Sequence, residues 1–131
     1  MKASLLGLAA AIAAMASTSA AAQGVAPGGA YASPDVELQV IVLTDDAYTT
    51  FASTTVVQGA CSGTIAGKAT VKGHTLSFGP ADDPASACRI SAEFDARWTL
   101  ATLRENGACA SHHGASCGWE GQTVRRVPLI R

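Results

Sequence analysis

The chain has few aromatic residues and no excess of basic charge. The first shortage limits the stability of its core, and the second limits the kinds of partner it can bind. Only 5% of its 131 residues are Phe, Trp or Tyr. Because each large buried side chain contributes about 1.5–3 kcal/mol, a core with so few of them needs an additional constraint. The formal net charge of −1 excludes the basic footprint of a nucleic-acid-binding protein. The C-terminal arginines Arg125, Arg126 and Arg131 fit a solvated strand face better than a binding patch.

The spacing of reactive residues does not define a catalytic site. A hydrolase needs a nucleophile, a base and an orienting acid brought together, and the scattered Ser, His and Asp residues indicate no such grouping. The adjacent carboxylates Asp45-Asp46 and Asp82-Asp83 fall at predicted turns, where aspartate is favoured for its local hydrogen bonding. We therefore expect a protein that is not an enzyme and needs no cofactor.

The N-terminus has the pattern of a secretory signal peptide. Lys2 precedes a short apolar run, and small residues end it at Ala20-x-Ala22. The run is too short and too rich in alanine to predict a membrane span. We expect residues 1–22 to be removed, the mature protein to be periplasmic or secreted, and the mature chain to contain no transmembrane segment.

The rest of the chain predicts a small all-β protein. Residues 23–35 are expected to form a flexible leader, since Gly and Pro punctuate them without any periodicity. From residue 36 to 131, short segments alternate apolar and polar residues between turns, with the clearest hairpin at Lys72-Gly73-His74. The pattern predicts one domain, an antiparallel sandwich or barrel of six to seven strands.

Four cysteines in a small exported domain predict two disulfides. The hairpin at Gly73 would return the chain from Cys61 toward Cys88, and Cys109 and Cys117 are close in sequence. We therefore expect the pairs Cys61–Cys88 and Cys109–Cys117, although four cysteines allow three connectivities.

The segment between the last two cysteines is the most informative one. Cys109-Ala-Ser-His112-His113-Gly-Ala-Ser-Cys117 would present two imidazoles on a loop closed by a disulfide. Reduced, the same residues would suit zinc or copper, but export favours the disulfide over a metal site. Without the cysteines, His112 and His113 would offer only a weak metal site, with His74 as a distant partner. Trp119 follows the loop, and tryptophan is common both in cores and in binding hot spots. Our candidate binding residues are His112, His113 and Trp119.

Two resemblances suggest what such a protein does. The residues Gly59-Ala-Cys61, Gly73-x-x-Leu76-x-Phe78-Gly-Pro80 and Ala87-Cys88 resemble the META domain, the small β-rich domain of a heat-shock-associated envelope protein of Gram-negative bacteria. This chain has Ser62 where the family usually has Asn, and it diverges after Cys88. The resemblance implies an envelope location and a stress-linked role without a catalytic site.

The loop at 109–117 is similar in kind to that of one class of bacterial proteinaceous lysozyme inhibitors, in which a disulfide-closed loop with a histidine enters the lysozyme cleft. This resemblance implies a binding module whose protein partner in the envelope is a lysozyme-like glycosidase. Two alternatives stay open at this point, which are a META-like stress domain without an inhibitory loop and a periplasmic zinc or copper binder.

Overall fold

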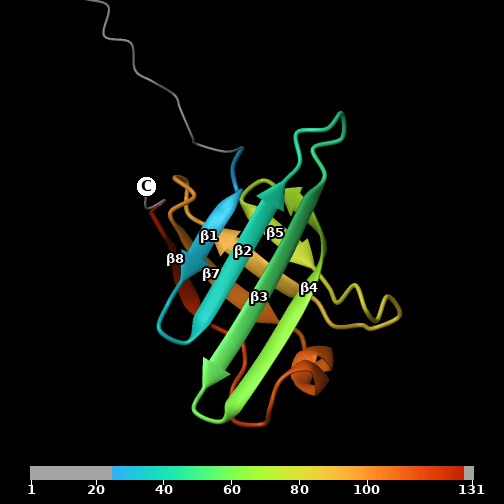
Figure 1. Ribbon diagram of the computed structural model, residues 1–131, viewed down its shortest axis with the longest axis vertical. Coiled ribbons are helices and arrows are strands. Elements are labelled where there is room, and N and C mark those ends of the chain that lie inside the picture. Colours follow the sequence, from blue (N-terminus) through green and yellow to red (C-terminus); the bar gives the residue numbers. More distant parts are fainter. Residues whose placement is uncertain (1–24, 129–131) are drawn as a thin grey trace, which may run out of the picture.

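A computed structural model describes residues 25–128, which form a closed antiparallel barrel. Each strand pairs with its neighbours in the sequence, and the last strand pairs with the first (Figure 1). The strands are β1 (Gly29–Ala32), β2 (Val36–Val42), β3 (Thr50–Gln58), β4 (Cys61–Lys72), β5 (Thr75–Phe78), β6 (Ile90–Phe94), β7 (Leu100–Glu105) and β8 (Thr123–Arg126). A 3₁₀ helix, η1 (Gly107–His112), separates the last two strands. The prediction of an all-β barrel or sandwich is confirmed.

Alternating side chains fill the inside of the barrel. Along β2, Val36, Leu38 and Val40 are buried, whereas Glu37 and Gln39 face solvent. The same period of two runs through β3, β5 and β6, as expected of strands with one buried face. The largest fully buried side chains are Trp119, Tyr31, Phe78, Leu38, Ile65, Leu76, Ile90 and Leu103. Because these side chains occupy the interior, a ligand has to bind on the outside of the barrel or at its ends.

The first strand corrects the prediction of a flexible leader over residues 23–35. β1 pairs with β2 from Gly29↔Val40 to Ala32↔Glu37 and with β8 at Tyr31↔Arg126, so it closes the barrel. Tyr31 is 1% exposed and donates its hydroxyl hydrogen to the Pro27 carbonyl. The strand has only four residues, and Gly and Pro lie around it, so its alternation of buried and exposed side chains is not recognisable in the sequence. With β1 included, the barrel has eight strands, whereas the sequence predicted six or seven.

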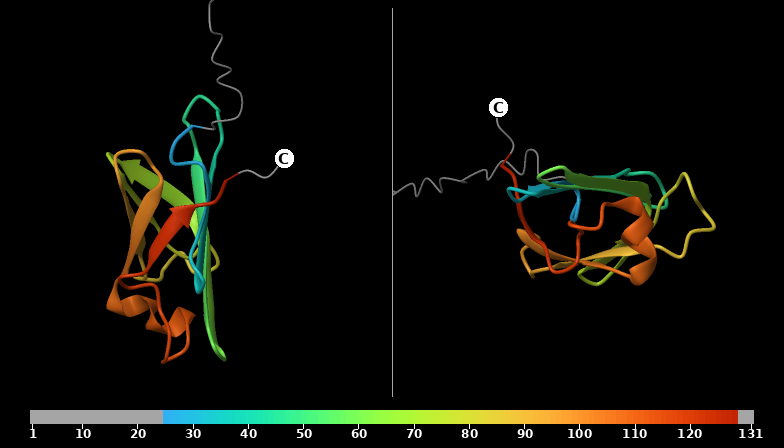
Figure 2. Two further views of the ribbon diagram at one scale, coloured as in Figure 1. Left: turned by 90° about the vertical axis from the view of Figure 1, so that its left-hand side faces the viewer. Right: turned by 90° about the horizontal axis from the view of Figure 1, so that it is seen from below.

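The β3–β4 hairpin reaches beyond the rest of the barrel (Figure 2). β4 pairs with β3 along Cys61–Ala69, whereas β5 covers β4 only from Ala69 to Lys72. After β5 the chain continues beside β4, and the Ala81 N–H donates to the Ala66 carbonyl at 2.9 Å. A Cβ on Gly67 would lie 2.0 Å from the Gly79 carbonyl oxygen, so this close approach requires glycine.

The predicted signal peptide lies outside the described residues. Within residues 25–128, no helix is both long and apolar enough to cross a membrane.

Candidate functional site

The cysteines form two disulfides, but their pairing differs from the one expected. Cys61 is bonded to Cys117, and Cys88 to Cys109. The hairpin at Gly73 forms, but it does not bring Cys88 back to Cys61. β5 pairs with β4 over only four residues, and the chain then loops away before it reaches Cys61. Instead, the β6–β7 pair places Ile90 opposite Glu105, which brings Cys88 near the start of η1. No cysteine among the described residues is free.

Residues 107–122 therefore form a cap over one end of the barrel rather than a separate disulfide loop. One bond ties the cap to Cys88, two residues before β6, and the other ties it to Cys61 at the tip of the β3–β4 hairpin. The backbone of the cap lies so close to β4 that a Cβ on Gly63 would be 2.4 Å from the His112 carbonyl oxygen. Likewise, a Cβ on Gly114 would be 2.6 Å from Cys61 Sγ. Both glycines allow the cap to seat against the hairpin.

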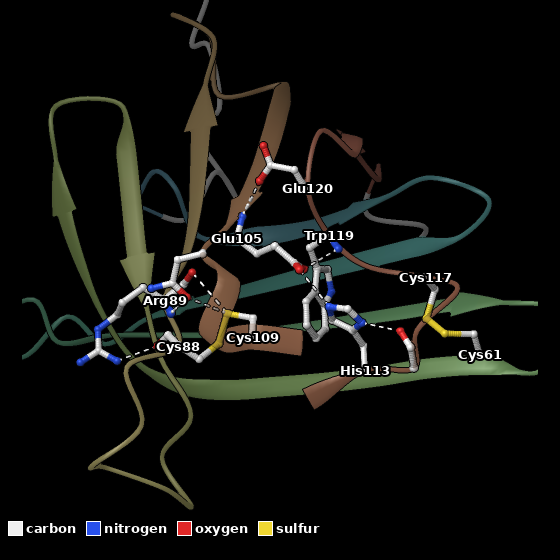
Figure 3. Close-up of polar contacts among 11 residues, drawn as sticks. Cys61, Cys88, Arg89, Glu105, Cys109, His113, Cys117, Trp119 and Glu120 are labelled. Atoms are coloured by element: carbon white, nitrogen blue, oxygen red, sulfur yellow. Dashed lines mark hydrogen bonds and ion pairs between the residues drawn. A yellow bond between two sulfur atoms is a disulfide. The ribbon is translucent and has the colours of Figure 1, made fainter. Parts of the chain in front are cut away.

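Glu105, at the end of β7, joins two residues of the cap through its carboxylate (Figure 3). Its Oε1 lies 2.8 Å from His113 Nε2, and its Oε2 accepts the Trp119 backbone N–H at 2.8 Å. His113 Nδ1 lies 2.6 Å from the Gly114 carbonyl oxygen, so both ring nitrogens face acceptors. These contacts raise the pKa of His113, chiefly through the Gly114 carbonyl and then through Glu105, against the opposing effect of burial.

The predicted binding residues thus have mainly structural positions. The side chain of His113 is 9% exposed and packs edge-on against Trp119, so the expectation that both imidazoles face solvent is wrong for His113. Trp119 is completely buried in the core. His112 is half-buried at the end of η1.

His74 does not join these two histidines but stacks on Trp98, with ring centroids 4.4 Å apart. In the part of the chain that the structure describes, no group of three or more His, Cys, Asp or Glu is arranged to hold a metal ion.

The cap also contains a motif that sequence reasoning missed. Gly114-Ala115-Ser116-Cys117-Gly118 has the Gly-x-Ser-x-Gly spacing of a nucleophile elbow, and His113 and Glu105 would complete a triad. The segment, however, is not a turn from a strand into a helix. With Nδ1 directed at the Gly114 carbonyl and Nε2 at Glu105, neither nitrogen of His113 is available to accept a proton from Ser116. The arrangement therefore lacks the bond between nucleophile and base.

A groove at the opposite end of the barrel has different properties. It has a volume of about 620 Å³ and lies beside both described ends of the chain. We call it the Trp98 groove. Its lining combines aliphatic side chains with one aromatic ring and two cations, from Val25, Ala26, Gly28, Gly29, Ala30, Val40, Ile41, Val42, Arg97, Trp98, Thr99, Arg126, Val127 and Pro128. Mostly apolar concave surfaces with a few polar groups are typical of ligand sites.

Trp98 has a backbone conformation that large residues rarely adopt. Its φ is +57°, in the left-handed region, which costs about 1–2 kcal/mol for a residue with a Cβ. The turn around it is held by Asp95, whose carboxylate accepts hydrogen bonds from the backbone N–H groups of Thr99 and Leu100 and from the Thr99 hydroxyl. The Thr99 hydroxyl contributes most to lowering the pKa of Asp95, followed by the Thr99 N–H.

Arg126 forms the charged wall of the groove. Its guanidinium donates to the carbonyls of Trp98 at 2.9 Å and Gly28 at 3.0 Å, and to the Tyr31 hydroxyl. These acceptors are all neutral, and no carboxylate of residues 25–128 lies within 4 Å of the guanidinium. The expectation of a solvated arginine is wrong for Arg126, because its side chain turns back across the barrel end and is half-buried. Three of its five N–H donors are used, which leaves two for a ligand.

No protein-family model, curated protein or solved structure matches this chain. The resemblances to the META domain and to lysozyme inhibitors therefore stay predictions.

Proposed function

We propose that this protein is a non-enzymatic binding module of an oxidising compartment, periplasmic or secreted, whose ligand site is the Trp98 groove. Two disulfides suit such a compartment. The observation that carries the proposal is the pairing of a strained, half-buried tryptophan with an arginine that has no anionic partner among the described residues. Strain of this kind persists where the surroundings enforce it, and it is concentrated at functional sites.

The lining defines the chemical class of the ligand. Arg97 and Arg126 favour an anionic group, and the ring of Trp98 with the aliphatic side chains of Val42 and Ile41 favours an apolar body next to it. A carboxylate attached to an apolar or planar group has both features. Such a group could belong to a small molecule or to a side chain of a protein partner in the envelope.

The expected inhibition of a lysozyme-like glycosidase by the cap has less support than ligand binding in the Trp98 groove. Of the three residues expected to contact the enzyme, Trp119 is buried, the side chain of His113 is only 9% exposed, and His112 is half-buried. Among residues 109–117 the exposed ones are Ala110, Ser111, Ala115 and Ser116, and they offer neither charge nor a large apolar side chain. We therefore place the ligand at the end of the barrel away from the cap.

Benzoate and benzamide test this proposal because they match in size and differ in charge. We expect benzoate to bind at least about tenfold more tightly than benzamide, as measured by calorimetric titration. Arg97→Ala and Trp98→Phe should each weaken benzoate binding. Arg125→Ala is the matched control, since Arg125 is exposed on β8 and does not line the groove. Equal affinities for the two probes, or an equal loss in the control, would overturn the proposal.

A further inference from the structure

A second groove lies on the outside of the barrel, across β4 and β5, and is independent of the Trp98 groove. It has a volume of about 560 Å³. Its floor consists of outward side chains of the two strands, and the segment after β5 forms a wall. The lining residues are Lys68, Thr70, Lys72, Thr75, Ser77, Phe78, Gly79, Pro80, Ala81, Pro84 and Arg89. We call it the basic groove.

The register of the two strands fixes the order of the polar groups on the floor. Thr70 lies opposite Ser77, and Lys72 lies opposite Thr75. Because alternate residues face the same side, Lys68, Thr70 and Lys72 form one outward row. Hydroxyl groups that can donate hydrogen bonds thus lie between and beside two ammonium groups.

Arg89 supplies a third cation with a fixed position. Its Nη1 donates to the Cys88 carbonyl at 2.7 Å (Figure 3) and to the Ser86 carbonyl at 3.3 Å. The Cys88–Cys109 disulfide fixes the backbone at this point. The guanidinium therefore keeps Nε and Nη2 free to donate, while the bonds from Nη1 limit the loss of side-chain entropy on binding.

None of the three cations is neutralised by the described part of the chain. The ion pairs of that part are Arg104–Glu120 and His113–Glu105, and no carboxylate lines the groove. The nearest acidic positions by sequence and register are Asp82 and Asp83 in the loop that forms the wall, and Glu93, which lies opposite Thr75 on β6. A protein with a net charge of −1 thus concentrates unpaired positive charge in one concave place.

The spacing indicates a ligand with several anionic groups. Lys68 and Lys72 are four residues apart along a strand, so their Cα atoms are separated by about 13 Å. One small anion contacts both ammonium groups only if both side chains lean toward it, whereas a linear chain of oxyanions can follow the row without that rearrangement. We propose that the basic groove binds a soluble, linear polyanion carrying phosphate groups, with Lys68, Lys72 and Arg89 as its cationic contacts and Thr70 and Ser77 as hydroxyl donors.

Calorimetric titration of the full mature protein with tripolyphosphate tests this proposal. We expect tripolyphosphate to bind at least about tenfold more tightly than orthophosphate, because linked groups engage several cations at once. Lys68→Ala and Lys72→Ala should each weaken binding about fivefold, and the affinity should fall as the salt concentration rises. Arg125→Ala removes one exposed charge outside both grooves and should leave binding unchanged.

Three results would overturn the proposal. Equal affinity for orthophosphate and tripolyphosphate would show that no extended polyanion is recognised. A loss in Arg125→Ala equal to that in Lys72→Ala would show a general charge effect. Vesicles of phosphatidylglycerol in phosphatidylcholine that bind through the lysines, together with no binding of tripolyphosphate, would assign the groove to lipid headgroups at a membrane surface instead of a soluble chain. Thermal unfolding of each variant shows whether its fold is intact.

Discussion

His113 Nε2 lies 2.8 Å from the carboxylate of Glu105, and this contact ties the cap to the end of β7. The second ring nitrogen faces the Gly114 carbonyl, so the imidazolium satisfies both acceptors, whereas the neutral ring has one hydrogen too few. The pKa of His113 is accordingly raised above its ordinary value in the folded state.

The first prediction concerns stability against pH. Because the pKa of His113 is raised in the folded state, protonated His113 contributes its full stabilisation below the unfolded-state pKa of about 6.5. This contribution is lost as the pH rises through the folded-state pKa. We expect the free energy of unfolding by urea to be larger at about pH 5.5 than at about pH 8.5, and His113→Asn to reduce this difference. His112→Ala, which alters the neighbouring imidazole, should retain it. The same pH dependence in His113→Asn would refute the role given to this contact.

The second prediction concerns the two disulfides. Cys61–Cys117 spans 56 residues and Cys88–Cys109 spans 21, so loop-closure entropy assigns them about 4 and about 3 kcal/mol of stabilisation. We expect the Cys61→Ser/Cys117→Ser variant to lose more unfolding free energy than the Cys88→Ser/Cys109→Ser variant in urea titrations. Non-reducing tryptic mapping checks the pairing itself. The peptide ending at Lys68 and peptides 73–89 and 105–125 should form one linked species, whereas Cys61–Cys88 with Cys109–Cys117 would leave the last peptide separate.

The third prediction concerns the glycines that seat the cap. Gly63→Ala would place a methyl group 2.4 Å from the His112 carbonyl oxygen, so the cap has to shift and the protein should lose stability. Gly107→Ala is the matched control, because nothing lies within 4 Å of its added Cβ. We expect a lower melting temperature for the first variant and little change for the second. Equal melting temperatures would contradict the close approach of the cap to β4.

The fourth prediction separates the two tryptophans. Trp98→Asn relieves the left-handed strain, since Asn tolerates this conformation, and loses the packing of the indole on Phe94 and His74. These effects oppose each other, so we expect the free energy of unfolding to change by less than about 1 kcal/mol while benzoate binding is lost. Trp119→Ala should instead cost about 3–5 kcal/mol, because it leaves a cavity in the core. A large loss of stability in Trp98→Asn would make Trp98 a structural residue.

Much of the fold follows from the two-residue period of the sequence. The alternation places Leu76 with Phe78, and Ile90 with Phe94, on inward faces, and all four are buried; the hairpin turns at Gly73 with a φ of +58°. β1 escaped detection because four residues between glycines and prolines give one inward aromatic side chain and little alternation.

The candidate sites depend on contacts between distant parts of the chain, and the spacing of residues along the sequence does not predict these contacts. Disulfide pairing follows from where β5 leaves β4 and from the β6–β7 register, which local sequence does not determine. The adjacency of His113 to Glu105 requires the chain to return across the barrel end after η1. The strain at Trp98 depends on the turn that Asp95 holds between β6 and β7, and the inward turn of Arg126 becomes visible only when β8 closes against β1.

The measurement that decides most directly between the two ends of the barrel is a ¹H–¹⁵N NMR titration of the mature protein with benzoate. We expect the first and largest shifts at the indole N–H of Trp98 and at the backbone amides of Gly28, Gly29 and Ala30, with the indole of Trp119 unmoved. Shifts that begin instead at the amides of residues 111–116 would place the ligand on the cap and contradict the assignment of the Trp98 groove.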